Sequence, residues 1–206
     1  VLCLQETKVS DKDFPYKTFE DIGYGVKFYG QKSYNGVAII SKVNIADIKY
    51  GFPGELNQLE ISEELHFQKR IISGLINGIR IINVYVPNGS SLNSEKFNYK
   101  INWLAMLNEY LVKQSKRGEP TCLLGDFNIA LDDNDIYAPD KFTGSIMASE
   151  IERKMLREAL GSRFKDSFRV FEKCSGHWSW WDYRNNSFEL NKGWRIDHIY
   201  LSNNLL

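Results

Sequence analysis

The feature that most constrains this chain is a short apolar run that stops at a glycine and is followed by a carboxylate and an amide. The run, Thr-Cys-Leu-Leu at residues 121–124, follows the turn-forming Gly118 and Pro120 and predicts a buried strand. Asp126 and Asn128 come after it and point to the same side if the chain stays extended. Taken alone, the pattern is more typical of a strand that ends in an Asx-type turn than of a functional site. Similar polar clusters elsewhere in the chain reverse that interpretation.

Apolar runs with strand-like and helical spacing predict a single α/β domain over residues 1–206. Asn77-Gly78 is the strongest hairpin signal and joins two long predicted strands. Strands on both sides of a long amphipathic helix imply two packed β-sheets with helices outside them. We expect strands at residues 1–4, 37–40, 67–76, 79–86, 121–124, 164–171, 178–183 and 194–201, and helices at 94–116 and 148–160.

The charge balance limits how the protein could hold a charged partner. Lys and Arg number 26, and so do Asp and Glu, so a polyanion must be bound by a local basic patch rather than by the field of the whole protein. Cys3, Cys122 and Cys174 show no metal-ligand spacing, and we interpret them as buried free thiols in the reducing compartment of a cytoplasmic protein. No apolar run approaches the roughly 20 residues of a membrane span. We expect a monomer without membrane association.

Polar clusters follow several predicted strands at the point where each strand ends. They are Gln5-Glu6, Tyr85 with Asn88, Asp126 with Asn128, the aromatic segment 179–184, and Asp197 within an apolar strand. Carboxylates and amides without a cysteine or histidine cluster favour a hard cation such as Mg²⁺ or Mn²⁺. Such a set suits phosphate ester hydrolysis, in which a water is placed in line and charge on the phosphate is neutralised. The structural alternative is a polar network that satisfies the ends of the sheets.

Six motifs, in their order along the chain, resemble the exonuclease III family of apurinic/apyrimidinic endonucleases. They are Leu-Gln-Glu-Thr-Lys at 4–8, Asn-Gly-Val-Ala-Ile at 35–39, Asn-Val-Tyr-Val-Pro-Asn-Gly at 83–89, Leu-Gly-Asp-Phe-Asn at 124–128, Trp-Ser-Trp-Trp-Asp-Tyr-Arg at 178–184 and Trp-Arg-Ile-Asp at 194–197. The Glu-Thr and Gly-Asp-x-Asn motifs also suit the wider endonuclease/exonuclease/phosphatase superfamily. The tryptophan-rich motif followed by Trp-Arg-Ile-Asp narrows the resemblance to the DNA-repair branch.

The resemblance implies a four-layer α/β sandwich, in which two packed mixed β-sheets are flanked by helices. It also implies roles for the residues at the strand ends. Glu6 would bind Mg²⁺ or Mn²⁺, and Tyr85 and Asn88 would contact the scissile phosphate. Asp126, oriented by Asn128, would activate the attacking water or assist the leaving group. Asp197 would orient a catalytic histidine.

The same resemblance implies how duplex DNA would be held. Trp180 and Trp194 are similar to the pocket walls that receive an extruded abasic sugar, which has no base to unstack and is therefore the easiest nucleotide to flip. Lys8, Lys96 and Arg184 would contact phosphates, although such residues are equally common on any surface. The expected activity is metal-dependent incision 5′ to abasic sites, with 3′-to-5′ exonuclease and 3′-phosphatase activity at DNA ends. The alternatives are a superfamily phosphatase acting on sugar or lipid phosphates and a catalytically inactive DNA-binding fragment.

Two residues of the family pattern are expected beyond the ends of this chain. They are a metal-binding asparagine before Val1 and a catalytic histidine after Leu206, so we expect a domain truncated at both ends. His198 is no substitute for that histidine, because neighbours in a strand face opposite sides and Asp197 is expected to face the site.

Overall fold

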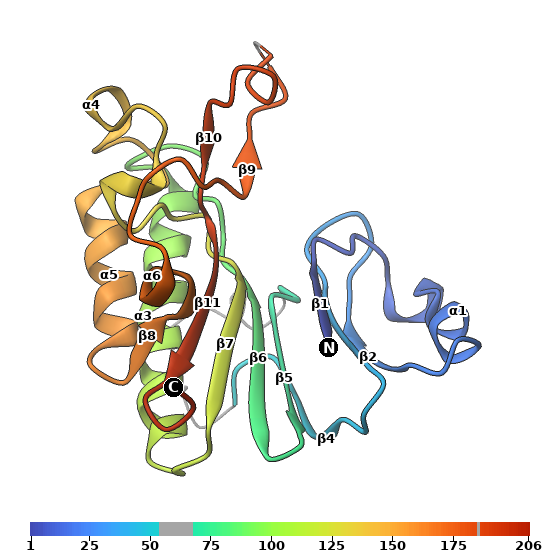
Figure 1. Ribbon diagram of the computed structural model, residues 1–206. Helices are drawn as coiled ribbons and strands as arrows, with labels where there is room; N and C mark the ends of the chain where they lie inside the picture. The colour runs from blue at the N-terminus through green and yellow to red at the C-terminus, as the bar shows by residue number, and fades with distance from the viewer. Residues whose placement is uncertain (54–67, 185) are drawn as a thin grey trace.

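Two main β-sheets and several helices make up the computed structural model, which describes residues 1–53, 68–184 and 186–206. The larger sheet has six strands in the order β4-β5-β6-β7-β11-β8. These strands are β4 (Ala46–Tyr50), β5 (Ile71–Ile76), β6 (Ile79–Tyr85), β7 (Thr121–Asp126), β8 (Phe164–Asp166) and β11 (Asp197–Ser202). The smaller sheet has the order β1-β3-β2 and consists of β1 (Leu2–Gln5), β2 (Gly25–Tyr29) and β3 (Val37–Ser41). A separate two-stranded ladder, β9 (Trp180–Trp181) with β10 (Gly193–Trp194), protrudes at one end of the molecule (Figure 1).

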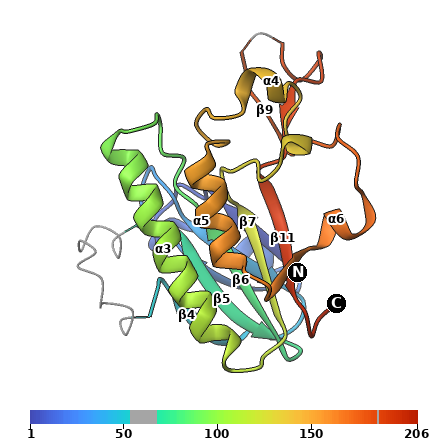
Figure 2. The ribbon, with the colours of Figure 1, turned by 90° about the vertical axis from the view of Figure 1, so that its left-hand side faces the viewer.

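The two faces of the larger sheet are covered differently. The helices α3 (Glu95–Ser115) and α5 (Glu150–Leu160) lie along one face, as Figure 2 shows, and the smaller sheet lies on the other (Figure 1). Leu104, Leu107 and Leu123 belong to the apolar core on the helix side, and Ile39 and Ile72 belong to the core between the sheets. The other α-helices in the described part of the chain are short: α1 (Tyr16–Glu20), α4 (Pro139–Phe142) and α6 (Ser167–Phe171).

One parallel pairing decides where the polar strand ends meet. Within the larger sheet β6 and β7 are parallel, while the other described pairs are antiparallel. A parallel pair needs a crossover connection, which α3 supplies here. The carboxyl ends of β6 and β7 therefore lie at the same edge of the sheet, where Tyr85 is the register partner of Asp126.

An amide bridge aligns the smaller sheet with this edge. The Asn83 side chain, on β6, is fully buried and donates to the carbonyl oxygens of Leu4 and Ala38, both at 2.9 Å. Its own carbonyl accepts from Gln5 Nε2 at 2.6 Å. Because both sheets are tied to this one amide, the end of β1 is fixed over the end of β6.

Several sequence predictions need correction. The strand predicted at 164–171 is wrong, because β8 ends at Asp166, whose carboxylate caps the N-terminus of α6. The strand predicted at 194–201 is two strands in two sheets, with Arg195 and Ile196 between them. The smaller sheet is antiparallel in both of its pairings rather than mixed. β5 begins at Ile71, and the predicted start at Phe67 lies outside the described residues.

Other predictions are confirmed. Asn77 and Gly78 form the turn between β5 and β6, each with a positive φ, as the short hairpin turn requires. The two predicted helices are present as α3 and α5, and serine side chains cap both. Among the described residues, no helix is long and apolar enough to cross a membrane.

Candidate active site

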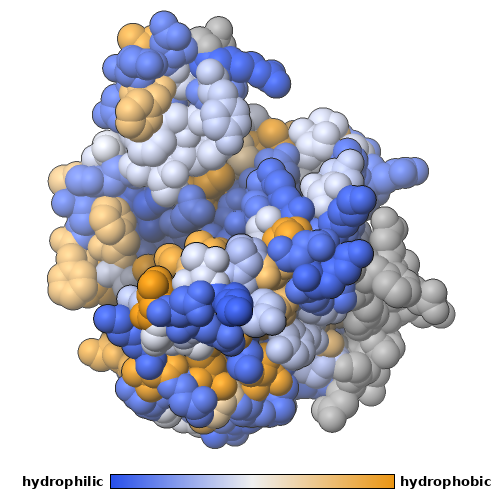
Figure 3. Space-filling model, turned by 90° about the vertical axis from the view of Figure 1, so that its right-hand side faces the viewer, coloured by the Kyte–Doolittle hydropathy of each residue, from blue (hydrophilic) through white to orange (hydrophobic). Residues whose placement is uncertain are grey.

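The polar ends of four strands converge at one edge of the molecule. Tyr85 pairs with Asp126, and Asp126 pairs with Asp197, so these residues lie side by side on β6, β7 and β11. Glu6 follows β1, and its carboxylate accepts a hydrogen bond from the Tyr85 hydroxyl. In Figure 3 the surface is hollowed between the protruding lobe at the top, which carries β9 and β10, and the body below it.

Glycine is required where Asp126 reaches this edge. A Cβ on Gly125 would come within 2.0 Å of the Val84 carbonyl oxygen, and its φ is +138°. No other residue fits so close to the neighbouring strand. The Leu-Gly-Asp sequence therefore has a structural reason that is independent of any chemistry at Asp126.

The side chains of Asp126, Asn128 and Asn88 form a hydrogen-bonded chain. Asn128 donates to both carboxylate oxygens of Asp126, from its backbone N at 2.8 Å and from Nδ2 at 3.1 Å. The side-chain Oδ1 of Asn128 accepts from Asn88 Nδ2 at 3.0 Å. Asn128 has a positive φ of 50°, a conformation that asparagine tolerates better than most residues. The Asp126 carboxylate is thereby fixed in orientation.

Burial and neighbouring groups shift the pKa values of the ionisable side chains at this edge. Burial, followed by the nearby charge of Asp197, raises the pKa of Asp126 to about 7. Burial also raises the pKa of Asp197. Burial would raise the pKa of Glu6 as well, but hydrogen bonds from Lys8, whose Nζ lies 2.6 Å from Oε2, and from Tyr85 hold it below its usual value. Burial and Glu6 raise the pKa of Tyr85, so its hydroxyl stays a donor at neutral pH.

This donor set fits a hard cation in part. Glu6 supplies a carboxylate, and the rise in the pKa of Asp126 caused by the nearby charges of Asp197 and Glu6 indicates excess negative charge that a divalent cation would relieve. Within the described ranges, however, no three His, Cys, Asp or Glu side chains group closely enough to form a metal cage. Magnesium commonly binds through one or two carboxylates, completed by waters and substrate phosphates. Glu6 could hold a cation only in that manner.

The predicted pocket residues lie beside this edge. Trp180 and Trp194 are register partners in the β9–β10 ladder. Trp194 is buried in an apolar cluster with Ile136 and Ile196, and the half-buried Trp180 packs against that cluster. The predicted phosphate contacts are all exposed: Lys8 just after β1, Lys96 in the first turn of α3, and Arg184 in the turn after β9.

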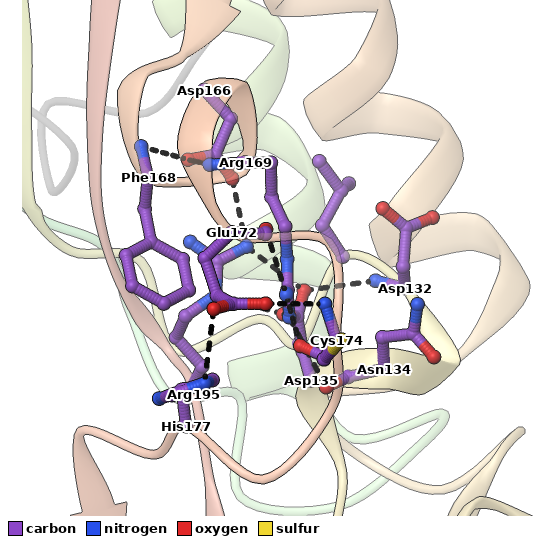
Figure 4. A network of polar contacts seen from close by, with 12 residues as sticks. Asp132, Asn134, Asp135, Asp166, Phe168, Arg169, Glu172, Cys174, His177 and Arg195 are labelled. Atoms are coloured by element: carbon purple, nitrogen blue, oxygen red, sulfur yellow. Dashed lines mark hydrogen bonds and ion pairs between the residues drawn. The ribbon is translucent and has the colours of Figure 1, made fainter.

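A buried charge network holds the crossing from β10 to β11 (Figure 4). Asp135 accepts hydrogen bonds from Arg195 Nε at 2.7 Å and from Arg169 Nη2 at 2.6 Å. Arg195 also donates to Asp166 at 2.7 Å. Because Arg195 lies between Trp194 and Asp197 in the sequence, this network fixes both of those residues at once.

Sequence reasoning missed two cations behind the site. The Arg70 guanidinium lies 4.6 Å from the centre of the Tyr85 ring and donates to the Tyr85 carbonyl at 3.2 Å. No sequence pattern around Arg70, which lies just before β5, indicated this contact. Lys100 is fully buried. It lies between Phe97 and Leu104 on the apolar stripe of the predicted helix. A lysine in such a stripe is unusual, so its position in the sequence was a signal for a buried charge.

Comparisons with known proteins agree with this arrangement. The chain matches the model of the Endonuclease/Exonuclease/phosphatase family over residues 1–206. It is 36% identical over 217 residues to exodeoxyribonuclease III of Haemophilus influenzae, which covers 100% of this chain and 78% of that protein. Among solved structures, the 3′ phosphatase NExo from Neisseria bound to a product DNA hairpin is similar with a TM-score of 0.90 and 37% identity, over 98% of this chain and 76% of that one. An AP endonuclease from Archaeoglobus fulgidus is similar with a TM-score of 0.88 and 35% identity, over 98% and 75% of the two chains.

Proposed function

Because the chain belongs to the exonuclease III and AP endonuclease family of DNA-repair nucleases, we propose that it incises duplex DNA 5′ to abasic sites. The proposal extends to 3′-to-5′ exonuclease and 3′-phosphatase activity, since all three reactions hydrolyse a phosphate ester on the 3′ oxygen of a nucleotide. The main support for this activity is the alignment of Tyr85, Asp126 and Asp197 on three adjacent strands, with Glu6 hydrogen-bonded to Tyr85.

In this proposal Asp126 is the group that moves a proton. Its pKa near 7 suits a general base at neutral pH, and Asn128 keeps both carboxylate oxygens in a fixed orientation. Asp126 accepts a proton from the water that attacks the phosphorus atom. Tyr85 and Asn88 donate hydrogen bonds to the phosphate, and Asp197 orients a catalytic histidine.

Glu6 would hold Mg²⁺ or Mn²⁺, which neutralises charge on the phosphate oxygens when it is bound. Trp180 and Trp194 would form the walls that accept an abasic sugar and exclude a nucleotide with its base. Lys8, Lys96 and Arg184 would contact DNA phosphates from their exposed positions.

The proposal also includes the layered arrangement of the fold and the cellular compartment of the protein. The helix pair, the two sheets and α1 on the outer side of the smaller sheet support a four-layer α/β sandwich (Figure 1). Cys3, Cys122 and Cys174 are free thiols, of which Cys174 is exposed rather than buried as predicted, and free thiols support a reducing compartment such as the cytoplasm. The proposal takes the protein to act as a monomer.

The test compares two substrates under the same conditions, with the protein as its full reading frame encodes it. One is a duplex with a single abasic site, and the other is a soluble phosphomonoester. A kcat/KM that is higher for the abasic duplex and depends on added Mg²⁺ supports the proposal. Preference for the phosphomonoester would indicate a superfamily phosphatase. Binding to DNA without cleavage, in the presence of Mg²⁺ or of Mn²⁺, would indicate an inactive DNA-binding protein.

A further inference from the structure

A fully buried lysine lies directly behind the two asparagines of the candidate site. Lys100 comes from the second turn of α3, on its buried face, and its side chain is 0% exposed. Its ammonium donates to the carbonyl oxygen of Asn128 at 2.8 Å and to that of Asn88 at 3.2 Å. One cation therefore joins the loop after β7 to the loop after β6.

The counterion of Lys100 is also completely buried. Glu152, on α5, lies 2.5 Å from the ammonium and is 0% exposed. Its carboxylate also accepts from the backbone N of Met147 at 3.1 Å and from the backbone N of Ser149 at 3.1 Å. With Ser149 it forms the capping box that begins α5. The pair thus connects both helices to the two asparagine loops.

A buried ion pair such as Lys100 and Glu152 adds little net stability to a fold. Two charges lose their hydration on burial, and well-packed apolar residues of similar volume often stabilise a core as well or better. What apolar residues cannot do is donate hydrogen bonds to two carbonyl groups at once. Each of these carbonyls belongs to an asparagine whose side chain points into the site, where Asn88 Nδ2 donates to Asn128 Oδ1.

We propose that Lys100 is a positioning residue for phosphodiester cleavage, which holds Asn88 and Asn128 at the spacing that aligns Asp126, while Glu152 keeps Lys100 in place. The inference rests on the proposed function, because it takes these asparagines to serve the scissile phosphate and the attacking water. Lys100 also acts through space, since its charge opposes the rise in the pKa of Asp126.

The decisive variant is Lys100→Met/Glu152→Gln. It removes both charges together, so no unpaired charge is left in the core, and glutamine can maintain the capping box. The matched control is Arg80→Met. Arg80 is likewise buried, at 1% exposed, and pairs with Asp47 and Glu119, but it lies at the opposite end of β6 from Tyr85.

For the double variant, kcat on an abasic duplex should fall about 10- to 100-fold, because small displacements of positioned groups have effects of that size. Affinity for uncleaved duplex should stay close to that of the wild type, since most of it comes from other phosphate contacts. The side-chain amide NMR signals of Asn88 and Asn128 should shift. Arg80→Met should lower the melting temperature while leaving kcat and those two signals unchanged. All assays are run below the lowest melting temperature.

Two results would overturn the inference: wild-type kcat in the double variant, or unshifted amide signals of Asn88 and Asn128. If the wild type itself does not cleave abasic DNA, the proposed function fails, while the amide signals still test the positioning. If the double variant does not fold, Glu152→Gln is measured alone, because it removes the counterion that keeps Lys100 in place. A lower kcat with shifted amide signals of Asn88 and Asn128 supports the inference in that variant, and wild-type kcat with unshifted signals contradicts it.

Discussion

Asp126 and Asp197 are register partners on the antiparallel strands β7 and β11. After burial, the proximity of Asp197 is the strongest influence that raises the pKa of Asp126, which reaches about 7. Two like charges directly opposite each other on paired strands destabilise a sheet. The consequence here is that the Asp126 carboxylate can both lose and accept a proton near neutral pH.

Asp197→Asn should lower the pKa of Asp126, because it removes the neighbouring negative charge and keeps the shape. The measurement is a carboxyl NMR titration of Asp126 in metal-free protein. The folded pKa lies above the unfolded value of about 3.9, so the stability that this group contributes is present below that pH and is lost as the pH rises through 7. The variant should lose less stability over this range. An unchanged Asp126 titration would show that burial alone sets the pKa.

His198 should give the opposite pH dependence. Burial and the charge of Arg195 lower its pKa to about 4, and its Nε2 lies 2.8 Å from the Ile129 carbonyl oxygen. Because the unfolded value is about 6.5, the stability from neutral His198 is present above pH 6.5 and is lost as the pH falls to 4. His198→Gln can keep a donor to that carbonyl but cannot titrate. Urea unfolding at pH 4.5 and pH 7 should show a pH-dependent loss about 2 kcal/mol smaller in the variant. Equal losses would contradict this account.

Glu6→Ala should weaken metal binding more than it weakens chemistry. Activity should fall at low Mg²⁺ and recover in part as the Mg²⁺ concentration is raised, because the substitution removes one ligand of a cation that is otherwise held by waters and phosphate. The measurement is kcat/KM against Mg²⁺ concentration for the variant and the wild type. Lys8→Ala is the control: it removes the ion-pair partner of Glu6 and a proposed phosphate contact but no metal ligand, so its loss of kcat/KM should not be recovered by added Mg²⁺. A loss that does not respond to metal would remove Glu6 from the metal site.

Local patterns made the strand-end residues predictable, whereas distant partners made other features unpredictable. A polar residue after an apolar run is visible in a few letters, and Glu6, Tyr85 and Asp126 each follow one. The break between Trp194 and Asp197 is not visible in this way, because it depends on the ion pair of Arg195 with Asp135, 60 residues earlier. The burial of Lys100 likewise depends on a partner 52 residues away. These two missed features are fixed by long-range contacts, whereas the wrong strand prediction at 164–171 has a local cause, the capping of α6 by Asp166.

The two tryptophans should separate stability from substrate discrimination. Trp194 is 6% exposed, so Trp194→Ala should cost about 3–5 kcal/mol of unfolding free energy. The half-buried Trp180 should cost less when it is replaced by alanine. If both line the pocket, each substitution makes room for a base and lowers the preference for an abasic over an intact nucleotide. Melting temperatures and cleavage of matched duplexes give both quantities. Unchanged preference with a large loss of stability would place the two residues in the core alone.

The central claim is that Asp126 performs proton transfer at a site that cleaves DNA. Asp126→Asn keeps the shape and removes the basic oxygen, so kcat on an abasic duplex should fall about 100- to 10,000-fold. Affinity for uncleaved duplex should remain close to that of the wild type. The most direct measurement is single-turnover cleavage together with equilibrium binding of the same abasic duplex by the wild type and Asp126→Asn. Lost cleavage with retained binding is the predicted result, and cleavage at the wild-type rate by Asp126→Asn would contradict the account.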